Sequence, residues 1–390
     1  ALFAPSAMTR PAASDPSDAA SAGQSFPYPV SPDLAAVLRR ALQSLPQPPG
    51  RIAVAVSGGA DSAMLAVHAA AVARAAGVEV LLFHVHHGLQ AAADGWSQQV
   101  RGLADLLGLP LRLARVQVDE ATGKGIEAAA RDARYAALAR LAQHDGVTLV
   151  LLAHHRNDQA ETVLLRLLRG TGLAGMAAMA PLTHRDGLTY LRPWLDEGRD
   201  AILQAAAQFT DATGWRPVQD PTNADPRYTR AALRELLAPA LDGRWPGWRA
   251  IVARHARHMA EAAEILDEVA RDDLAGLEPG PDGASFSLAA WRKLSPARQA
   301  QALRYWLAQN GARMPTDARL RDLLRQLREL HSLGHDRQLR VEQAGHVIRC
   351  HRGRVWLEAR PVDGQRSAKP RPIPAPEPEN SAKDDKFREK

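Results

Sequence analysis

The stretch Ser57-Gly58-Gly59-Ala60-Asp61-Ser62 decides the fold, because it stands where an apolar strand pattern changes into a helical one. Ile52, Val54 and Val56 are β-branched and alternate before it, whereas Ala, Leu and Met dominate residues 63–76. Two glycines at such a junction let backbone N–H groups approach an anion closely, and the helix N-terminus adds partial positive charge. The stretch therefore predicts a phosphate-binding loop between a strand and a helix.

The side chains of this loop favour a nucleotide bound together with a divalent cation. Hydroxyls at Ser57 and Ser62 can bond phosphate oxygens, whereas Asp61 would repel them unless a cation such as Mg²⁺ lies between. The loop is not a Walker A sequence, because no lysine follows it, and Gly123-Lys124-Gly125 fails the same test. A serine-capped helix after a glycine turn remains the non-functional interpretation.

Composition excludes several classes of protein. A chain of 390 residues with 46% hydrophobic residues can form two or three domains with real cores. We expect a cytoplasmic protein that does not enter membranes, because there is no run of eighteen apolar residues and no secretory signal pattern. The single cysteine, Cys350, excludes an internal disulfide framework and any multi-cysteine metal site.

Strand and helix patterns alternate from Arg51 onward. We expect strands near 52–56, 78–85, 111–118 and 147–153, and helices near 61–76, 94–108, 125–143 and 158–169. This alternation predicts an α/β fold, a doubly wound parallel sheet covered on both faces. Ligands bind beyond the carboxyl ends of the strands in such sheets. Polar clusters follow three of the four expected strands, so the sequence predicts one site at that edge.

The cluster after the fourth strand contains candidate catalytic residues. Asp158 and Glu161 follow His154 at spacings of four and seven, so we expect all three on one face of a helix. A histidine with two carboxylates near a phosphate loop can hold Mg²⁺, deprotonate an attacking group and orient an amine. Carboxylates that merely cap the helix are the alternative.

Three further residues are candidates for this site. His84 and His86 lie at the end of the second strand, and the histidines there raise the hypothesis of a zinc site. Side chains of adjacent residues diverge at a strand end, however. The alternative is that these histidines form hydrogen bonds that shape the turn. Arg131 and Arg134 lie three apart near a helix start and suit bidentate contact with phosphate.

The C-terminal part of the chain is basic. Residues 291–360 contain 15 basic and 6 acidic residues, which suits a polyanion such as RNA, although a solvated arginine-rich helix face has the same charge pattern. Trp245, Trp248, Trp291 and Trp306 can stack on bases, but buried tryptophans are commoner.

The order of these motifs resembles one family. The loop SGGADS resembles the signature of the PP-loop ATP pyrophosphatases, which have an adenine nucleotide alpha hydrolase-like fold. Together with HVHHGL, AHHRNDQAETVLL, RGTGLAG, the Arg192-Pro193 pair and Asp220-Pro221-Thr222-Asn223 before Tyr228-Thr229-Arg230, it resembles the bacterial tRNA(Ile)-lysidine synthetases from about Arg51 to Pro239. Ala231 departs from that family, in which asparagine follows the arginine.

The resemblance implies a ligase that attaches L-lysine to C2 of the wobble cytidine of tRNA(Ile) with a CAU anticodon, through an adenylated intermediate, with release of AMP and pyrophosphate. ATP is the implied co-substrate and Mg²⁺ the implied metal ion. The alternatives are a PP-loop tRNA thiolation enzyme, which the lone cysteine disfavours, and a non-catalytic RNA-binding protein.

The resemblance also implies roles for the candidate residues. In this scheme the loop cradles the ATP phosphates, Asp61 binds Mg²⁺ and Arg131 or Arg134 offsets charge that develops on phosphate. Asp158 and Glu161 bind Mg²⁺ or the lysine ammonium, and His154 orients or deprotonates the amine. The residues assigned to ATP binding are Ser57, Gly58, Gly59, Ala60, Asp61, Ser62, His84 and Arg131.

We expect four regions along the chain. Residues 1–49 form a disordered extension, 50–240 the PP-loop ATP-binding domain, 241–360 a helical linker and a smaller mostly helical or α+β tRNA-binding domain, and 361–390 a disordered tail. The chain is expected to lack the second C-terminal domain of longer family members. The sequence leaves the oligomeric state open, with a homodimer as one arrangement.

Overall fold

The computed structural model describes residues 26–86, 93–117, 126–221, 225–330, 339–343 and 345–359. The chain divides into two compact units, residues 1–262 and 263–390, and the boundary falls inside the long helix α10 (Trp248–Ala275). Residues 1–25, 361–390, 87–89 of the HVHHGL motif and 222–223 of the Asp220–Asn223 motif lie outside the described residues.

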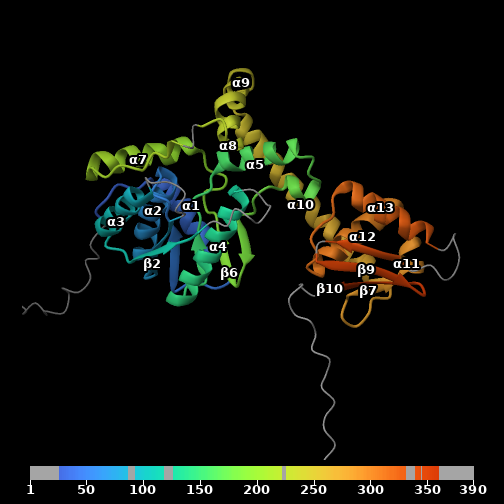
Figure 1. Cartoon of the computed structure of the whole chain (residues 1–390). Helices are drawn as coiled ribbons and strands as arrows, with labels where there is room; N and C mark the ends of the chain where they lie inside the picture. The colour runs from blue at the N-terminus through green and yellow to red at the C-terminus, as the bar shows by residue number, and fades with distance from the viewer. Residues whose placement is uncertain are drawn as a thin grey trace, which may run out of the picture. The chain divides into compact units, whose positions relative to one another are not determined.

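Unit 1 is built on a six-stranded sheet with the order β3-β2-β1-β4-β6-β5. Strands β2 and β6 of this sheet are labelled in Figure 1. All neighbouring pairs are parallel except β5 with β6. The six strands are β1 (Arg51–Ala55), β2 (Glu79–His86), β3 (Leu111–Arg115), β4 (Leu149–Leu151), β5 (Leu182–Arg185) and β6 (Leu188–Leu191). The predicted doubly wound α/β fold is confirmed.

Helices cover both faces of this sheet because its strands are apolar on both sides. Ile52 and Val54 of β1 pack into one core with α1 (Pro32–Gln43), α2 (Ala60–Ala76), α3 (Ala93–Leu107) and α7 (Arg199–Thr213). Ala53, on the opposite face of the same strand, joins a second core with α4 (Ile126–Asp145). Continuous burial of this kind is expected for parallel strands.

The strand order places a topological switch point between β1 and β4. From β1 the chain runs to β2 and β3 on one side, and then returns to place β4 on the other side. The loops that follow β1 and β4 therefore leave the sheet in opposite directions, and ligands of open α/β sheets bind in the crevice between such loops. The phosphate loop follows β1, and the His154-His155 segment follows β4.

The structure differs from the expected disordered extension over residues 26–49. Helix α1 packs on α2 through the fully buried side chains of Leu34 and Leu38. Ser31 caps α1, and its backbone N–H donates to His68 Nε2 at 2.9 Å. The expectation of disorder rested on the polar, proline-rich flanks of this segment. Apolar contacts on one stripe of α1 hold the segment against α2 instead.

The remaining described helices of unit 1 lie between β4 and β5 or after β6. They are α5 (Arg156–Leu168), α6 (Leu173–Met176), α8 (Thr229–Ala232), the π-helix η3 (Leu233–Leu237), α9 (Ala238–Arg244) and the first part of α10. Trp248 packs with Ala160 and Ala238, so α10 begins within the first unit. This unit extends to residue 262, beyond the expected boundary at residue 240.

In the described residues, unit 2 combines a four-stranded antiparallel sheet, in the order β7-β10-β9-β8, with the last part of α10 and three further helices. Trp291 and Trp306 are fully buried in its core. Its elements are β7 (Ser285–Ser287), α11 (Leu288–Arg292), α12 (Pro296–Gln309), α13 (Asp317–Glu329), β8 (Leu339–Gln343), β9 (His346–His351) and β10 (Arg354–Ala359). In the described part of the chain, no helix is long and apolar enough to cross a membrane.

Candidate functional site

The loop that joins β1 to α2 leaves the first turn of that helix open to an anion. Gly59 is the N-cap residue and offers no side-chain cap, and among the described residues no side chain bonds the N–H groups of Ala60, Asp61 or Ser62, so these donors are available to a ligand. Gly58 has a φ of 95°, a conformation that favours glycine, and a Cβ there would lie 3.0 Å from Val218 Cγ2. The Val218 N–H also donates to the Gly58 carbonyl at 2.9 Å.

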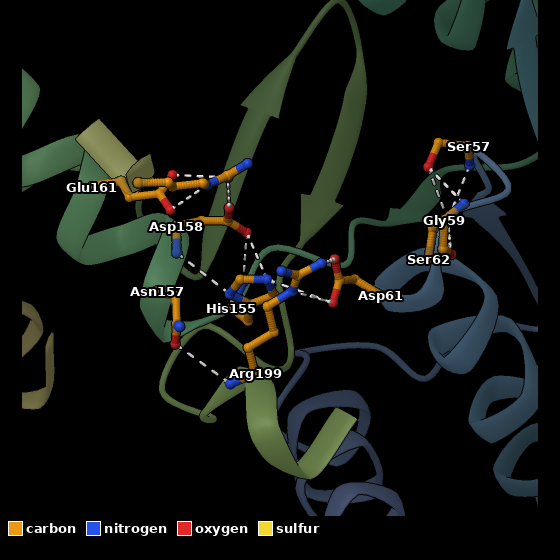
Figure 2. A network of polar contacts seen from close by, with 10 residues as sticks. Ser57, Gly59, Asp61, Ser62, His155, Asn157, Asp158, Glu161 and Arg199 are labelled. Carbon is orange, nitrogen blue, oxygen red and sulfur yellow. Dashed lines mark hydrogen bonds and ion pairs between the residues drawn. The ribbon is translucent and has the colours of Figure 1, made fainter. Parts of the chain in front are cut away.

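The two serines of the loop have different surroundings (Figure 2). Ser62 is buried, and its hydroxyl lies 3.0 Å from the Ser57 nitrogen, 3.1 Å from Ser57 Oγ and 3.2 Å from the Gly59 carbonyl oxygen. Ser57, Gly59, Ala60 and Asp61 line the adjoining cleft, whereas Ser62 does not. In this structure the Ser62 hydroxyl therefore fixes the shape of the loop.

His155 lies between two carboxylates at the centre of the site (Figure 2). Its Nε2 is 3.6 Å from Asp61 Oδ1 and 3.5 Å from Asp158 Oδ2. The residue is also the N-cap of α5: its Nδ1 accepts from the Asp158 N–H at 3.4 Å, and Asp158 Oδ2 accepts from the His155 N–H at 3.2 Å. Because Nδ1 accepts, a ring proton lies on Nε2, where it faces both carboxylates.

Two arginines form ion pairs with the carboxylates. Arg199, the first residue of α7, donates to Asp61 from Nε and Nη2 at 3.3 and 3.4 Å. Arg234 of η3 donates to Glu161 at 2.6 and 2.9 Å and approaches Asp158 at 3.6 Å. Burial alone would raise the pKa of Asp61, but the hydrogen bond and charge of His155 and the charge of Arg199 outweigh it and hold this pKa below its usual value.

The π-helix that carries Arg234 has an identifiable cause. Pro239 has no N–H with which to bond the carbonyl four residues earlier, and its ring would clash with that carbonyl. The turn before it widens, and the Ala238 N–H bonds the Leu233 carbonyl five residues back. Wide turns of this kind occur frequently at functional sites.

Glu161 lies behind Arg234 and not on the surface of the cleft. It is buried, and it is absent from the residues that line the cleft, although Asp158 and Thr162 on the same helix are present. The structure thus brings Asp61 and Asp158 together at the cleft and places Glu161 where it holds Arg234.

His154 is in a different environment from the carboxylates. Helix α5 begins at Arg156, so His154 precedes it and does not share a helical face with Asp158 and Glu161 as the spacing suggested. Burial, followed by the charges of Arg192, Arg134, Arg131 and Arg230, lowers the pKa of His154 well below its usual value. His154 is therefore a neutral imidazole among guanidinium groups.

His84 does not reach the cleft. It is buried on β2, its Nδ1 bonds the Val56 carbonyl at 2.8 Å, and its Nε2 lies 3.3 Å from Ser97 Oγ. This arrangement matches the alternative of a hydrogen-bonded histidine that shapes the turn after the strand.

The loop, the carboxylates and the arginines line one cleft of about 1160 Å³. Seven arginines and four acidic residues are among its described lining residues, so the cleft carries an excess of positive charge. His155, Arg199 and Arg234 are not among the site residues predicted from the sequence. His155 had a signal, because it directly precedes the helix that carries Asp158, but nothing local to Arg199 or Arg234 connects them with residues 70 to 140 positions earlier.

The residues present fit a magnesium ion. In the described ranges no set of three or more His, Cys, Asp or Glu side chains is arranged to hold a metal ion. Mg²⁺, however, commonly takes one or two carboxylates and completes its shell with water and substrate phosphates. Asp61 and Asp158 present such oxygens beside the phosphate loop, on either side of His155.

Comparisons with known proteins agree with this geometry. A family model described as a PP-loop domain matches residues 32–241, and one described as the TilS substrate binding domain matches residues 286–356. A tRNA(Ile)-lysidine synthase from Bordetella bronchiseptica is 67% identical over 85% of this chain and 98% of its own length. The corresponding proteins from Bordetella pertussis and Ralstonia nicotianae are 68% and 48% identical, over 82% and 83% of this chain and 99% and 67% of theirs.

Proposed function

The chain belongs to the tRNA(Ile)-lysidine synthase family, and we propose that it joins L-lysine to C2 of the wobble cytidine in a tRNA(Ile) with a CAU anticodon. It is an ATP-dependent enzyme of tRNA modification. The observation that carries the proposal is a single cleft, at the switch point of the sheet, that combines an open phosphate loop with a pair of carboxylates.

The chemistry requires two steps. The C2 carbonyl oxygen of cytosine attacks the α-phosphate of ATP, a new P–O bond forms, and pyrophosphate leaves. The lysine ε-amine then attacks C2 and loses a proton, the C–O bond breaks, and AMP leaves. An amide-like carbonyl is a poor electrophile until its oxygen becomes part of a phosphate leaving group, so adenylation makes the second step feasible.

The Ser57–Ser62 loop would hold the phosphates of ATP. The N–H groups at the start of α2 would supply donors for phosphate oxygens, and the helix terminus adds favourable charge. Asp61 and Asp158 would hold Mg²⁺, which supplies charge stabilisation to the phosphates when it is bound. Arg199 is positioned to hold the Asp61 carboxylate in place.

The carboxylates would also attract the lysine ammonium. Asp158 faces the cleft, and Glu161 sets the local charge by fixing Arg234 beside it. His154 remains the candidate for taking the amine proton, because it is neutral at neutral pH and an ammonium has no lone pair with which to attack. Its low pKa makes it a weak base until an anion offsets the surrounding arginines.

A direct assay tests this function. The purified chain is incubated with ATP, Mg²⁺, radiolabelled lysine and an unmodified tRNA(Ile) transcript with a CAU anticodon, and the RNA is digested to nucleosides. We expect label in one modified cytidine, and none when ATP is omitted or when the anticodon cytidine is replaced by uridine.

Two other outcomes would change the proposal. Pyrophosphate exchange into ATP that depends on this tRNA, without incorporation of lysine, would keep the adenylation step and replace the nucleophile. Absence of both activities, in a preparation that still binds ATP and tRNA, would contradict the catalytic proposal.

A further inference from the structure

Five arginines gather around one part of the cleft, and no described carboxylate pairs with them. Within the described ranges, none of their guanidinium groups forms an ion pair with a carboxylate. Their recorded hydrogen bonds go to neutral acceptors, such as the Gly175 and Ala178 carbonyls for Arg166 and Thr162 Oγ1 for Arg230. The arginine cluster consists of Arg131, Arg134, Arg166, Arg192 and Arg230, and all except Arg192 line the cleft.

The neighbours of the cluster place it apart from the phosphate loop. Asp61 and Asp158 contact His155 from two sides, and the Thr162 hydroxyl donates to the Asp158 carbonyl oxygen at 2.7 Å. Arg230 in turn donates to Thr162 at 3.3 Å. This series of contacts leads from Asp61 through His155, Asp158 and Thr162 to Arg230, so the two carboxylates lie between the phosphate loop and the cluster.

His154 provides a second, independent observation at the cluster. Its Nδ1 is buried and has no hydrogen-bond partner, which is costly unless a ligand supplies one. The charges of four arginines act on this ring, and in the described ranges no carboxylate pairs with these guanidinium groups to offset their mutual repulsion. Both features indicate a site that an anion completes.

Contacts with neutral groups hold two of these guanidinium groups in place before an anion binds. Arg192 is held by the Ala180 carbonyl at 2.9 Å and by Thr183 Oγ1 at 3.1 Å, and Arg131 stacks over the Tyr135 ring at 5.0 Å. Arginines fixed by neutral groups keep their full charge and lose little further entropy on binding a phosphate.

We propose that the arginine cluster binds a phosphodiester of the RNA beside the reacting nucleotide, while the Ser57–Ser62 loop takes the phosphates of ATP. The proposal rests on the proposed function and revises the sequence-based assignment of Arg131 and Arg134 to ATP. A cytidine that enters the cleft brings a phosphodiester on each side of its sugar, and these charges need partners that a loop occupied by ATP does not supply. The carboxylates between the two regions keep the two anions apart.

Binding measurements with the full chain separate the two anions. Arg230→Gln and Arg134→Gln are compared with Arg74→Gln, a matched loss of charge at the exposed far end of α2. For each cluster variant we expect the Kd for the tRNA transcript to rise about tenfold and the slope of log K against log salt to flatten by about 1. The Kd for Mg-ATP without RNA should change by less than about twofold, and Arg74→Gln should alter neither.

A modified RNA identifies the source of the phosphate. Transcripts with one uncharged methylphosphonate linkage on either side of the wobble cytidine are titrated against the wild-type chain and the Arg230→Gln variant. At one of these linkages, the methylphosphonate should weaken binding to the wild-type chain by about the same factor as Arg230→Gln weakens binding to unmodified RNA. The same linkage should weaken binding to the Arg230→Gln variant little further, because the arginine and the phosphate act as a pair.

Several results would overturn the proposal. A rise in the Kd for ATP or for free pyrophosphate, with unchanged affinity and salt slope for RNA, would assign the cluster to the phosphates of ATP. An equal loss of affinity for the tRNA transcript in Arg74→Gln would show that the effect comes from general electrostatic attraction and not from the cluster. These binding measurements do not require turnover. A wild-type chain that forms no lysidine would therefore refute the proposed function, while the binding measurements would still decide whether the cluster binds a phosphate of the RNA.

Discussion

Replacing Glu161 with glutamine tests whether this residue acts through Arg234. The carboxylate accepts two hydrogen bonds from the guanidinium, at 2.6 and 2.9 Å, and its side chain is only 7% exposed. Glutamine keeps the shape and one acceptor oxygen, but it leaves the Arg234 charge with Asp158 alone, at 3.6 Å. We therefore expect both a loss of stability and a change at the cleft.

The magnitude follows from the environment of the pair. Breaking a fully buried ion pair by removing one partner costs about 3–5 kcal/mol. Because Arg234 is 31% exposed and keeps a second carboxylate nearby, we expect a cost of about 2 kcal/mol. For a domain the size of unit 1 this corresponds to a decrease in melting temperature of about 4–8 °C.

Thermal unfolding followed by circular dichroism measures this cost. The matched control is Glu235→Gln, one residue from Arg234 on the same π-helix, because Glu235 is exposed and its replacement should cost less than about 0.5 kcal/mol. A Glu161→Gln variant that melts at the same temperature as the wild type, but has lost activity, would contradict a role through Arg234 and assign Glu161 to direct contact with substrate.

Three further predictions concern the loop and a buried histidine. Asp61→Asn should lower turnover by at least about 100-fold, measured as lysine incorporation, while the Kd for tRNA stays within about twofold; loss of both would indicate a structural role. Gly58→Ala should cost about 1–3 kcal/mol in chemical denaturation and weaken ATP binding, because its φ is 95° and the new Cβ would meet Val218; unchanged ATP affinity would contradict a close approach of backbone to phosphate. Burial lowers the pKa of His68 below the ordinary 6.5, so the unfolded chain binds the extra proton and stability should fall as pH drops below about 6.5; the melting temperature of His68→Gln should depend less on pH between 7.5 and 5.5, and an equal slope would exclude His68 as the source.

Local patterns were sufficient to predict the central sheet and the helices that flank it. Alternating β-branched residues, glycines at the strand ends and long alanine-rich segments predict the first four strands and their helices within a few residues of their observed ends. The hairpin of β5 and β6 was missed, although Asp186-Gly187 between two short apolar segments is a typical two-residue turn, with φ values of 53° and 76°.

Prediction of the site succeeded where chemistry is local and failed where it depends on tertiary contacts. The loop signature and Asp158 needed only their own neighbours in sequence. The role of His155 could not be separated from that of His154, because a shift of two residues in the start of α5 decides which ring meets the carboxylates. Arg199 lies 138 positions from its partner Asp61, and no periodicity connects them.

The tryptophans show the same limit. Trp248, Trp291 and Trp306 are buried, as the commoner interpretation expected, whereas Trp245 is 56% exposed. Composition gives the same expectation for all four, and only the packing of the surrounding helices separates them.

The π-helix before Pro239 has a consequence for how the protein is made. Arg234 is supplied by the chain 73 positions after Glu161, so a nascent chain that has completed β4 and α5 still lacks the counter-charge for a carboxylate that the finished fold buries. β4 must also insert beside β1 across a long separation in sequence, which slows folding. The ATP cleft is therefore a late product of synthesis, and a ribosome-bound fragment that ends before residue 234 should not yet hold the nucleotide.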